Sequence, residues 1–215
     1  CGFSGCRPYA EAIVAGEACP PDLLTQARTR LPQTQLYNEY GPTEASVWST
    51  VWRMPRDAKE QVSRVPIGKA IDGARVYVTD DRLRLAPIGA PGEIVIGGPG
   101  VTRGYLDRPE LTAERFVPDP FGDDGARVYR TGDLARRLAD GTLDLIGRLD
   151  DQVKLRGYRV ELGEIESALR THAAVRDAVV ILGRSGGESA LLAYVVTKGK
   201  ATRNETKAAA GSGSE

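Results

Sequence analysis

The sequence predicts an α/β fold of the mixed α+β, strand-rich kind, in which short strands and short helices follow one another. Its 215 residues include 25 glycines and 13 prolines, so turns must be frequent and the segments between them short. Hydrophobic residues make up 41% of the chain and charged residues 27%, which is the composition of a globular protein. β-branched and aromatic residues gather in short runs, as they do in strands.

The predicted strands are short runs of β-branched, aromatic or other apolar residues, bounded by glycine, proline or polar turn residues. In the first two thirds of the chain they cover residues 11–15, 34–38, 47–54, 74–79, 92–96, 127–130, 134–138 and 142–146. The pair Gly41-Pro42 ends the second of these runs. The pair Asp140-Gly141 predicts a hairpin turn between the last two.

Two helices are expected in the same part of the chain. Residues 21–31 begin with Pro21, carry apolar residues at helical spacing and stop before Pro32, which are the usual start and stop signals of a helix. Residues 109–116 predict a second, shorter helix.

The pattern changes after Gly147. The elements expected there are a strand, an amphipathic helix and two apolar strands, at residues 152–156, 161–171, 175–182 and 191–197. Together they predict a small α+β module that begins at a boundary near residues 149–151. Residues 198–215 hold no large apolar residue, so we expect a linker-like or tag-like tail.

Composition excludes several classes of protein. Lys and Arg number 29 and Asp and Glu also 29, so the strong positive charge of a general nucleic-acid binder is missing. The apolar runs are far shorter than the roughly 18 residues that a membrane-spanning helix needs. The three cysteines all lie within the first 19 residues without a CxxC pair, which favours reduced thiols in a cytoplasmic protein. We expect no nucleic-acid partner and no membrane.

Four short clusters carry residues that suit nucleotide chemistry: residues 38–44, 129–133, 147–150 and 154–159. Thr43 can donate to a phosphate oxygen, and Glu44 is a hard oxygen ligand of the kind that Mg²⁺ uses beside phosphates. Asp133 can accept two ribose hydroxyls, and the Arg148 guanidinium can bind phosphate. Each cluster by itself also fits an ordinary role, as a β-corner, a turn-capping aspartate, a surface arginine or a solvated strand.

Taken together, in this order and at these spacings, the clusters resemble the adenylation domain of nonribosomal peptide synthetases, within the family of adenylate-forming enzymes. The stretches that carry the resemblance are NEYGPTEASVWST, GEIVIGGPGVTRGYLDRPELTAERFVPDPF, YRTGDLARRLADGTLDLIGRLDDQVKLRGYRVELGEIESAL and VRDAVVIL. They cover about residues 10–197 without a sizeable gap. The resemblance implies a partial adenylate-forming-enzyme fold: residues 1–149 would end the large subdomain and residues 150–197 would form most of the small C-terminal one.

The resemblance also implies a reaction. ATP and an amino acid would give an aminoacyl adenylate and pyrophosphate, with Mg²⁺ beside the phosphates. The acyl group would then pass to the phosphopantetheine thiol of a peptidyl carrier domain. A small MbtH-like helper protein is a further partner that the resemblance suggests. Such a reaction needs positioning and charge neutralisation rather than a protein nucleophile, and the chain contains nothing like a Ser-His-Asp triad.

Carried over by position, the family pattern assigns roles to individual residues. Those expected to lie along or beside the adenine are Gly16, Glu17, Asn38, Glu39 and Tyr40. The Tyr40 ring would stack on the base, Thr43 would meet the α-phosphate and Glu44 would hold Mg²⁺. Asp133 would hold the ribose hydroxyls, and Arg148 would reach ribose or phosphate.

Further positions match the side-chain pocket, the hinge and the thiol tunnel of the family. The pocket positions are Ile13, Ala15, Glu39, Val47 and Trp48. Because Trp48 would fill the pocket floor, we expect a small or short polar amino acid. Asp150 matches the hinge residue, and Gly157 matches a residue that lines the thiol tunnel.

The chain departs from the family pattern in ways that bear on activity. It contains neither the Gly-rich phosphate loop with its lysine nor the segment that carries the catalytic lysine, so we expect the isolated chain to be inactive. The tail is expected to be a truncation with a linker appended or the edge of an inserted domain. Two alternatives stay open: another adenylate-forming ligase of the acyl-CoA synthetase type, and a non-catalytic fragment that docks a carrier or helper protein.

Overall fold

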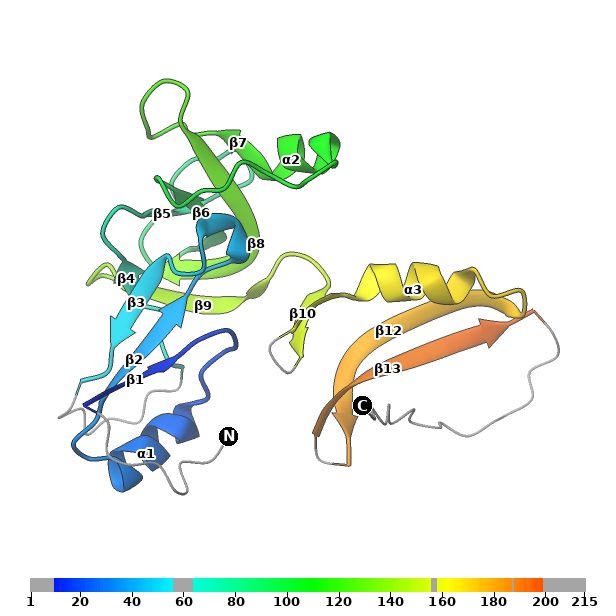
Figure 1. The fold of residues 1–215 in the computed structure, drawn as a ribbon, viewed down its shortest axis with the longest axis horizontal. Helices are drawn as coiled ribbons and strands as arrows, with labels where there is room; N and C mark the ends of the chain where they lie inside the picture. Colours follow the sequence, from blue (N-terminus) through cyan, green and yellow to red (C-terminus); the bar gives the residue numbers. More distant parts are fainter. Residues whose placement is uncertain (1–9, 56–63, 156–157, 187, 199–215) are drawn as a thin grey trace. The chain divides into compact units, whose positions relative to one another are not determined.

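The computed structural model describes residues 10–55, 64–155, 158–186 and 188–198. The chain divides into two compact units, Cys1–Leu149 and Asp150–Glu215 (Figure 1). The first contains two β-sheets and two α-helices, and the second contains two antiparallel strand pairs and one α-helix.

The first sheet of the first unit has four strands in the order β1-β2-β3-β4. Their bounds are β1 Glu11–Val14, β2 Gln35–Tyr40, β3 Thr50–Arg53 and β4 Lys69–Ala70. Strands β1 and β2 are parallel, and helix α1 (Pro21–Arg30) connects them. The helix starts at Pro21 and ends before Pro32, as its sequence predicts. Its buried residues Leu24 and Ala27 belong to a core cluster with Leu36 of β2.

The second sheet is antiparallel and has five strands. They are β5 Arg75–Thr79, β6 Pro91–Gly97, β7 Phe116–Pro118, β8 Arg127–Arg137 and β9 Leu143–Arg148. Helix α2 (Pro109–Arg115) leads directly into β7. Strand β8 is the centre of this sheet, because β6, β7 and β9 all pair with it.

The two sheets meet in one core. Gly68 and Leu143 form an isolated bridge between them, with hydrogen bonds from Leu143 N–H to Gly68 O and from Ile67 N–H to Leu143 O. The buried side chains at this junction come from both sheets: Tyr40, Ala45, Ile67, Val78, Ile94, Ile96, Ala135 and Leu143. The junction therefore brings the end of β2 close to the middle of β8.

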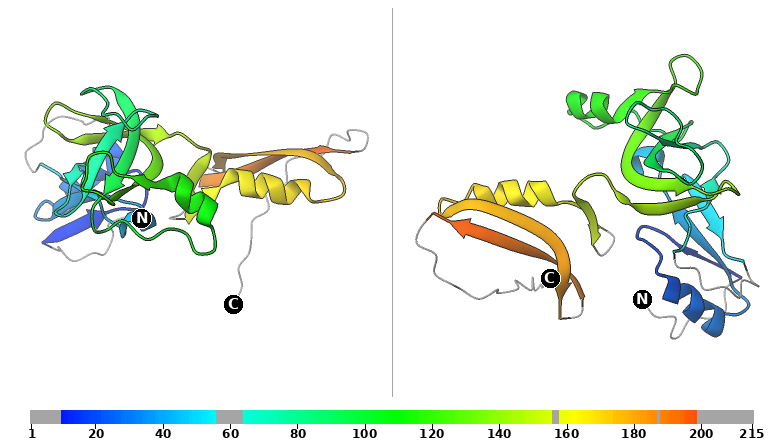
Figure 2. Two further views of the ribbon diagram at one scale, coloured as in Figure 1. Left: turned by 90° about the horizontal axis from the view of Figure 1, so that it is seen from above. Right: turned by 180° about the vertical axis from the view of Figure 1, so that it is seen from behind.

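The second unit contains two hairpin-like strand pairs and a helix. Its elements are β10 Gln152–Leu155, β11 Tyr158–Glu161, α3 Leu162–Arg170, β12 Val175–Ser185 and β13 Glu188–Thr197. Strand β10 pairs with β11, and β12 pairs with β13. Helix α3 lies along one face of the β12–β13 pair, where Ala178 and Val180 are buried (Figure 2). Glu166 fixes the helix by accepting the Val180 N–H at 2.9 Å.

Several sequence predictions need correction. Residues 47–49 are not a strand, because Ser46 and Val47 adopt left-handed φ angles of 58° and 76° that turn the chain before β3. The runs predicted at 127–130 and 134–138 are a single strand, β8. The sequence does not predict the short strands β4, β7 and β11. Residue 156, the end of a predicted strand, and residues 199–215 of the predicted tail lie outside the described residues. Lys198, the first residue of the predicted tail, donates its N–H to Ala174 O.

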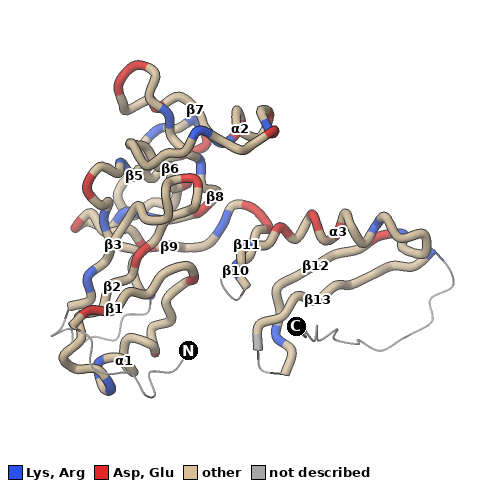
Figure 3. The backbone as a smooth tube through the Cα atoms, in the orientation of Figure 1, with Lys and Arg blue, Asp and Glu red and all other residues tan. Residues whose placement is uncertain are grey.

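The surface charge follows the balanced composition. Basic and acidic residues are interspersed along both units (Figure 3). None of the helices in the described part of the chain combines the length and apolar character needed to cross a membrane.

Candidate nucleotide site

The chain turns sharply after β2, and this turn presents two of the predicted site residues. Gly41 sits so close to the returning chain that a Cβ there would lie 2.3 Å from Val47 O. A short 3₁₀ helix, η1 (Thr43–Ala45), follows. Thr43 is exposed and Glu44 is half-buried.

The centre of the candidate site is a buried three-residue cluster of Tyr40, Asp133 and Arg148. The Tyr40 hydroxyl donates to Asp133 Oδ2 at 2.5 Å. Arg148 Nη1 donates to Asp133 Oδ1 at 2.5 Å, and Arg148 Nη2 donates to Thr131 O at 3.2 Å. Burial and the neighbouring Asp133 charge raise the pKa of Tyr40 well above its usual value, so its hydroxyl stays a donor at neutral pH. The cluster joins three of the four sequence clusters in space.

The backbone around Asp133 is held by residues that sequence reasoning did not single out. Glu93 is 5% exposed and accepts the Gly132 N–H at 3.0 Å through Oε1, while Oε2 pairs with Arg130 at 2.7 Å. Gly132 has a φ of 72°, which glycine adopts without strain. The Thr131 hydroxyl donates to Ile94 O and accepts the Asp133 N–H. These bonds fix the irregularity in β8 that aims Asp133 at Tyr40 and Arg148.

Glu44 belongs to a second cluster with two tyrosines. Tyr105 OH donates to Glu44 Oε1 at 2.6 Å and Tyr129 OH donates to the same oxygen at 2.9 Å. Among the described residues, no group of three or more His, Cys, Asp or Glu side chains could hold a metal ion. A Mg²⁺ ion held by Glu44 would complete its shell with phosphate and water, as is usual for Mg²⁺ beside a nucleotide. Oxygen ligands of this kind, a carboxylate together with phosphate and water, suit Mg²⁺.

The predicted adenine-lining residues do not share one face of the first sheet. The pairing register places Asn38 and Tyr40 on one face and Glu39 on the other, because neighbouring residues of a strand alternate. Asn38 is buried and its amide donates to Pro66 O at 2.7 Å. Tyr40 has 6% of its surface exposed. Gly16, with a φ of 86°, and Glu17 form an exposed turn after β1.

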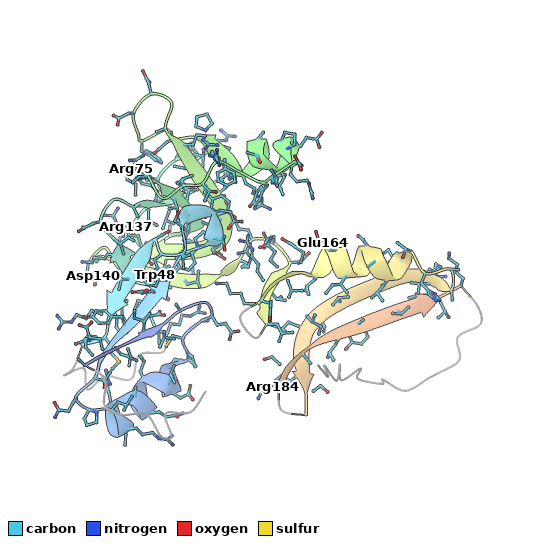
Figure 4. All side chains as sticks on the ribbon, viewed as in Figure 1. Trp48, Arg75, Arg137, Asp140, Glu164 and Arg184 are labelled. Atoms are coloured by element: carbon cyan, nitrogen blue, oxygen red, sulfur yellow. The ribbon has the colours of Figure 1, made fainter. Side chains whose placement is uncertain are left out.

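Two of the predicted pocket residues, Ile13 and Glu39, lie on the opposite face of the first sheet. Ile13 pairs with Tyr37 across the parallel strands, so Ile13 and Glu39 share a face. Ile13, Val47 and Trp48 are large apolar side chains with 52%, 58% and 48% of their surfaces exposed. Figure 4 labels Trp48 among the side chains of the first unit. Ala15 is exposed just beyond the end of β1. Glu39 Oε2 is buried, has no hydrogen-bond partner within the described residues, and burial raises the pKa of the carboxyl.

The two predicted hinge and tunnel residues fall in the second unit. Asp150 is its first residue and its Oδ1 accepts the Gln152 N–H at 3.3 Å. Gly157 lies outside the described residues.

Comparison with known proteins agrees with this geometry. The family described as "AMP-binding enzyme" matches residues 7–106. Tyrocidine synthase 3 of Brevibacillus parabrevis is 49% identical over 185 residues, which are 86% of this chain and 3% of that protein. Gramicidin S synthase 2 of Brevibacillus brevis is 44% identical over 206 residues, which are 95% of this chain and 4% of that protein.

Solved structures of similar fold also match the chain. The structure of holo-PA1221, described as an NRPS protein containing adenylation and PCP domains bound to a vinylsulfonamide inhibitor, has a TM-score of 0.81 and is 33% identical. The match covers 90% of this chain and 34% of that one. Residues 7–106 thus belong to the AMP-binding enzyme family, whose model they match. The chain is similar to nonribosomal peptide synthetase proteins with adenylation domains, and it spans a small part of each synthase and about a third of the solved chain.

The candidate site also contains residues to which the sequence motifs assigned no role. Tyr105, Glu93 and Arg130 lie in motif stretches that support the family resemblance, but nothing in their own residue type distinguishes them from structural residues. A sequence signal exists for Arg130 alone, which stands directly before the Thr-Gly-Asp run.

Proposed function

We propose that the protein to which this chain belongs activates an amino acid with ATP and passes it to a carrier domain. The products of the first step are an aminoacyl adenylate and pyrophosphate. In the second step the phosphopantetheine thiol of the carrier attacks the acyl carbon and AMP leaves. The observation that carries the proposal is the buried Tyr40–Asp133–Arg148 cluster, in which three separate family motifs meet at bonding distance.

The cluster has the chemistry that a nucleoside site requires. Asp133 is an acceptor that is oriented by both of its neighbours and is 6% exposed, so its charge acts in a weakly screened environment. A ribose diol can donate to such a carboxylate. Arg148 supplies a planar donor fork beside it that suits a ribose oxygen or a phosphate.

Thr43 and Glu44 would act on the phosphate side of the same site. Thr43 is exposed on the turn after β2 and can donate to a phosphate oxygen. Glu44 would hold Mg²⁺, which neutralises phosphate charge when it is bound. The residues thus position the two substrates and balance charge, while the attacking atom is the carboxylate oxygen of the amino acid itself.

The substrate proposal rests on exposed apolar residues of β1 and of the turn before β3, together with Glu39 of β2. Trp48 is half-exposed and would occupy volume in a pocket that also contains Ile13 and Val47. Glu39 brings a carboxyl oxygen that has no hydrogen-bond partner within the described residues. A small or short polar side chain fits both features, because it needs little volume and can donate to Glu39.

The experiment is amino-acid-dependent ATP–pyrophosphate exchange with the parent protein, across the proteinogenic amino acids. The proposal expects exchange that depends on one amino acid or a few similar ones. The 215-residue chain alone serves as the control and is expected to give none, because it contains neither the phosphate loop nor the catalytic lysine motif. Exchange driven by fatty or aryl acids, with transfer to free coenzyme A, would instead support the acyl-CoA synthetase type of ligase.

A further inference from the structure

The loop after β6 is bonded to the turn that carries Glu44. Thr102 N–H donates to Glu44 O at 2.9 Å, and the Ser46 hydroxyl donates to Gly100 O at 2.7 Å. Gly100 lies so close that a Cβ there would be 3.2 Å from Ala45 O. The loop and the turn are therefore one structural piece, although more than 50 residues separate them in the sequence.

The same loop delivers Tyr105 to the Glu44 side chain. Tyr105 is held by Thr112 of α2, whose hydroxyl accepts the Tyr105 N–H at 2.9 Å. Gly104, with a φ of 139°, makes this possible, because a Cβ there would lie 2.3 Å from the Thr112 methyl group. The Tyr105 ring packs edge-on against Phe116, with centroids 5.5 Å apart. These contacts position Tyr105 without using the Glu44 side chain.

Tyr129 reaches the same carboxylate oxygen from β8. Tyr129 is fully buried, and its ring centroid lies 5.1 Å from that of Phe116. Its hydroxyl is 3.3 Å from the Tyr105 hydroxyl. Two donors fixed by separate elements therefore converge on Glu44 Oε1.

We propose that Tyr105 and Tyr129 are positioning residues that hold the Glu44 carboxylate in place for the divalent cation of the nucleotide. The inference rests on the proposed function. Mg²⁺ demands near-ideal octahedral geometry, so a carboxylate fixed at one oxygen binds it with less loss of side-chain freedom. Hydrogen bonds behind a metal ligand commonly change metal affinity or activity by about 10- to 100-fold.

The direct test measures binding without turnover. Mn²⁺ is titrated into the parent protein with ATP and without amino acid, and binding is followed by water-proton relaxation. Tyr105→Phe and Tyr129→Phe are each expected to weaken Mn²⁺ binding by roughly 10-fold, and Glu44→Gln by at least as much. The matched control is Tyr37→Phe, which removes another tyrosine–glutamate hydrogen bond, from Tyr37 OH to Glu11 Oε1 at 3.3 Å. It is expected to bind Mn²⁺ like the wild type.

A kinetic readout separates positioning from a general loss of structure. In ATP–pyrophosphate exchange, the tyrosine variants should need about 10-fold more Mg²⁺ for half-maximal rate and should recover most of the rate at saturating Mg²⁺. If Glu44→Gln weakens Mn²⁺ binding and neither tyrosine variant does, the positioning role is wrong and the proposed function stands. If the wild-type parent binds no Mn²⁺ with ATP, the proposed function fails and the inference fails with it.

Discussion

The Tyr40 hydroxyl connects the stability of the chain to its candidate site. It is a buried donor to Asp133, and burial and that negative charge raise the pKa of Tyr40 well above its usual value near 10. Between the unfolded and the folded pKa the folded chain binds more protons than the unfolded chain, so stability must fall as pH rises in that range. Below the unfolded pKa this contribution is fully present.

Tyr40→Phe tests this link. At neutral pH the variant should lose about 1–3 kcal/mol of unfolding free energy, because a buried carboxylate loses a donor. Above pH 10 its stability should fall less steeply than that of the wild type, by up to about 1.4 kcal/mol per pH unit. Urea unfolding of the 215-residue chain between pH 7 and about 11 measures both effects. Equal pH slopes for the two chains would show that Tyr40 does not keep its proton.

Trp48 is the residue that should limit the size of the substrate. It is 48% exposed, in the turn that leads into β3. Trp48→Ala in the parent protein should extend exchange activity to larger amino acids, because it removes an indole from the pocket floor. The measurement is the ratio of kcat/KM for a large over a small amino acid. A wild type that prefers Phe, Tyr or Trp, with no change in the variant, would contradict the assignment.

At the scale of elements, Gly68 joins the two sheets of the first unit. Its φ is 86°, and a Cβ would lie 1.8 Å from Val51 O, so the β3 backbone occupies the space of a side chain. Gly89 has nearly the same φ, 83°, but open space around its Cβ position. Alanine substitutions at Gly68 and Gly89 therefore separate the cost of a left-handed φ from the cost of a steric clash.

Gly89→Ala should therefore cost only the left-handed strain, about 1–2 kcal/mol. Gly68→Ala should cost that and the displacement of β3, roughly a further 1–3 kcal/mol. Thermal or urea unfolding of the two variants provides the comparison. Similar losses of unfolding free energy in both variants would mean that the junction between the sheets accommodates a methyl group without a steric cost.

The sequence predicted most elements because their signals are local. Pro21 and Pro32 bracket α1, and the alternating or β-branched runs coincide with β5, β6 and β12. The errors have physical causes. The Thr-Gly-Asp run at 131–133 looks like a turn, but the buried Glu93 accepts the Gly132 N–H and keeps β8 continuous. The left-handed pair Ser46 and Val47 stands where the chain passes close to Gly41, and neither serine nor valine is a residue type that signals such a φ.

The candidate site was predictable only as separate pieces. The motifs named Tyr40, Asp133 and Arg148, but local patterns contain no information that pairs residues 93 positions apart, as Tyr40 and Asp133 are. Tyr105 and Tyr129 were not assigned a role, because a tyrosine beside a hydrophobic run is usually a core residue. Their convergence on Glu44 is a property of the folded chain.

At the scale of the whole molecule, the division into two units makes a prediction about proteolysis. The units are Cys1–Leu149 and Asp150–Glu215, and Leu149 at their junction is 58% exposed. Limited digestion with thermolysin should cut the 215-residue chain near residues 148–151, or in the tail, before it cuts within residues 152–197. Mass spectrometry of the first fragments identifies the site. Early cleavage inside β12 or β13 would contradict the boundary.

If Asp133 binds the ribose of ATP during amino-acid activation, Asp133→Asn in the parent protein should impair the use of ATP. Asp119→Asn is the matched control, because Asp119 is also a buried aspartate paired with an arginine, Arg75 at 3.0 Å, outside the candidate site. In amino-acid-dependent ATP–pyrophosphate exchange, kcat/KM for ATP should fall by about 10²-fold or more in Asp133→Asn and only a few-fold in Asp119→Asn. Equal losses in two variants that unfold at similar temperatures, or full exchange activity in Asp133→Asn, would contradict it.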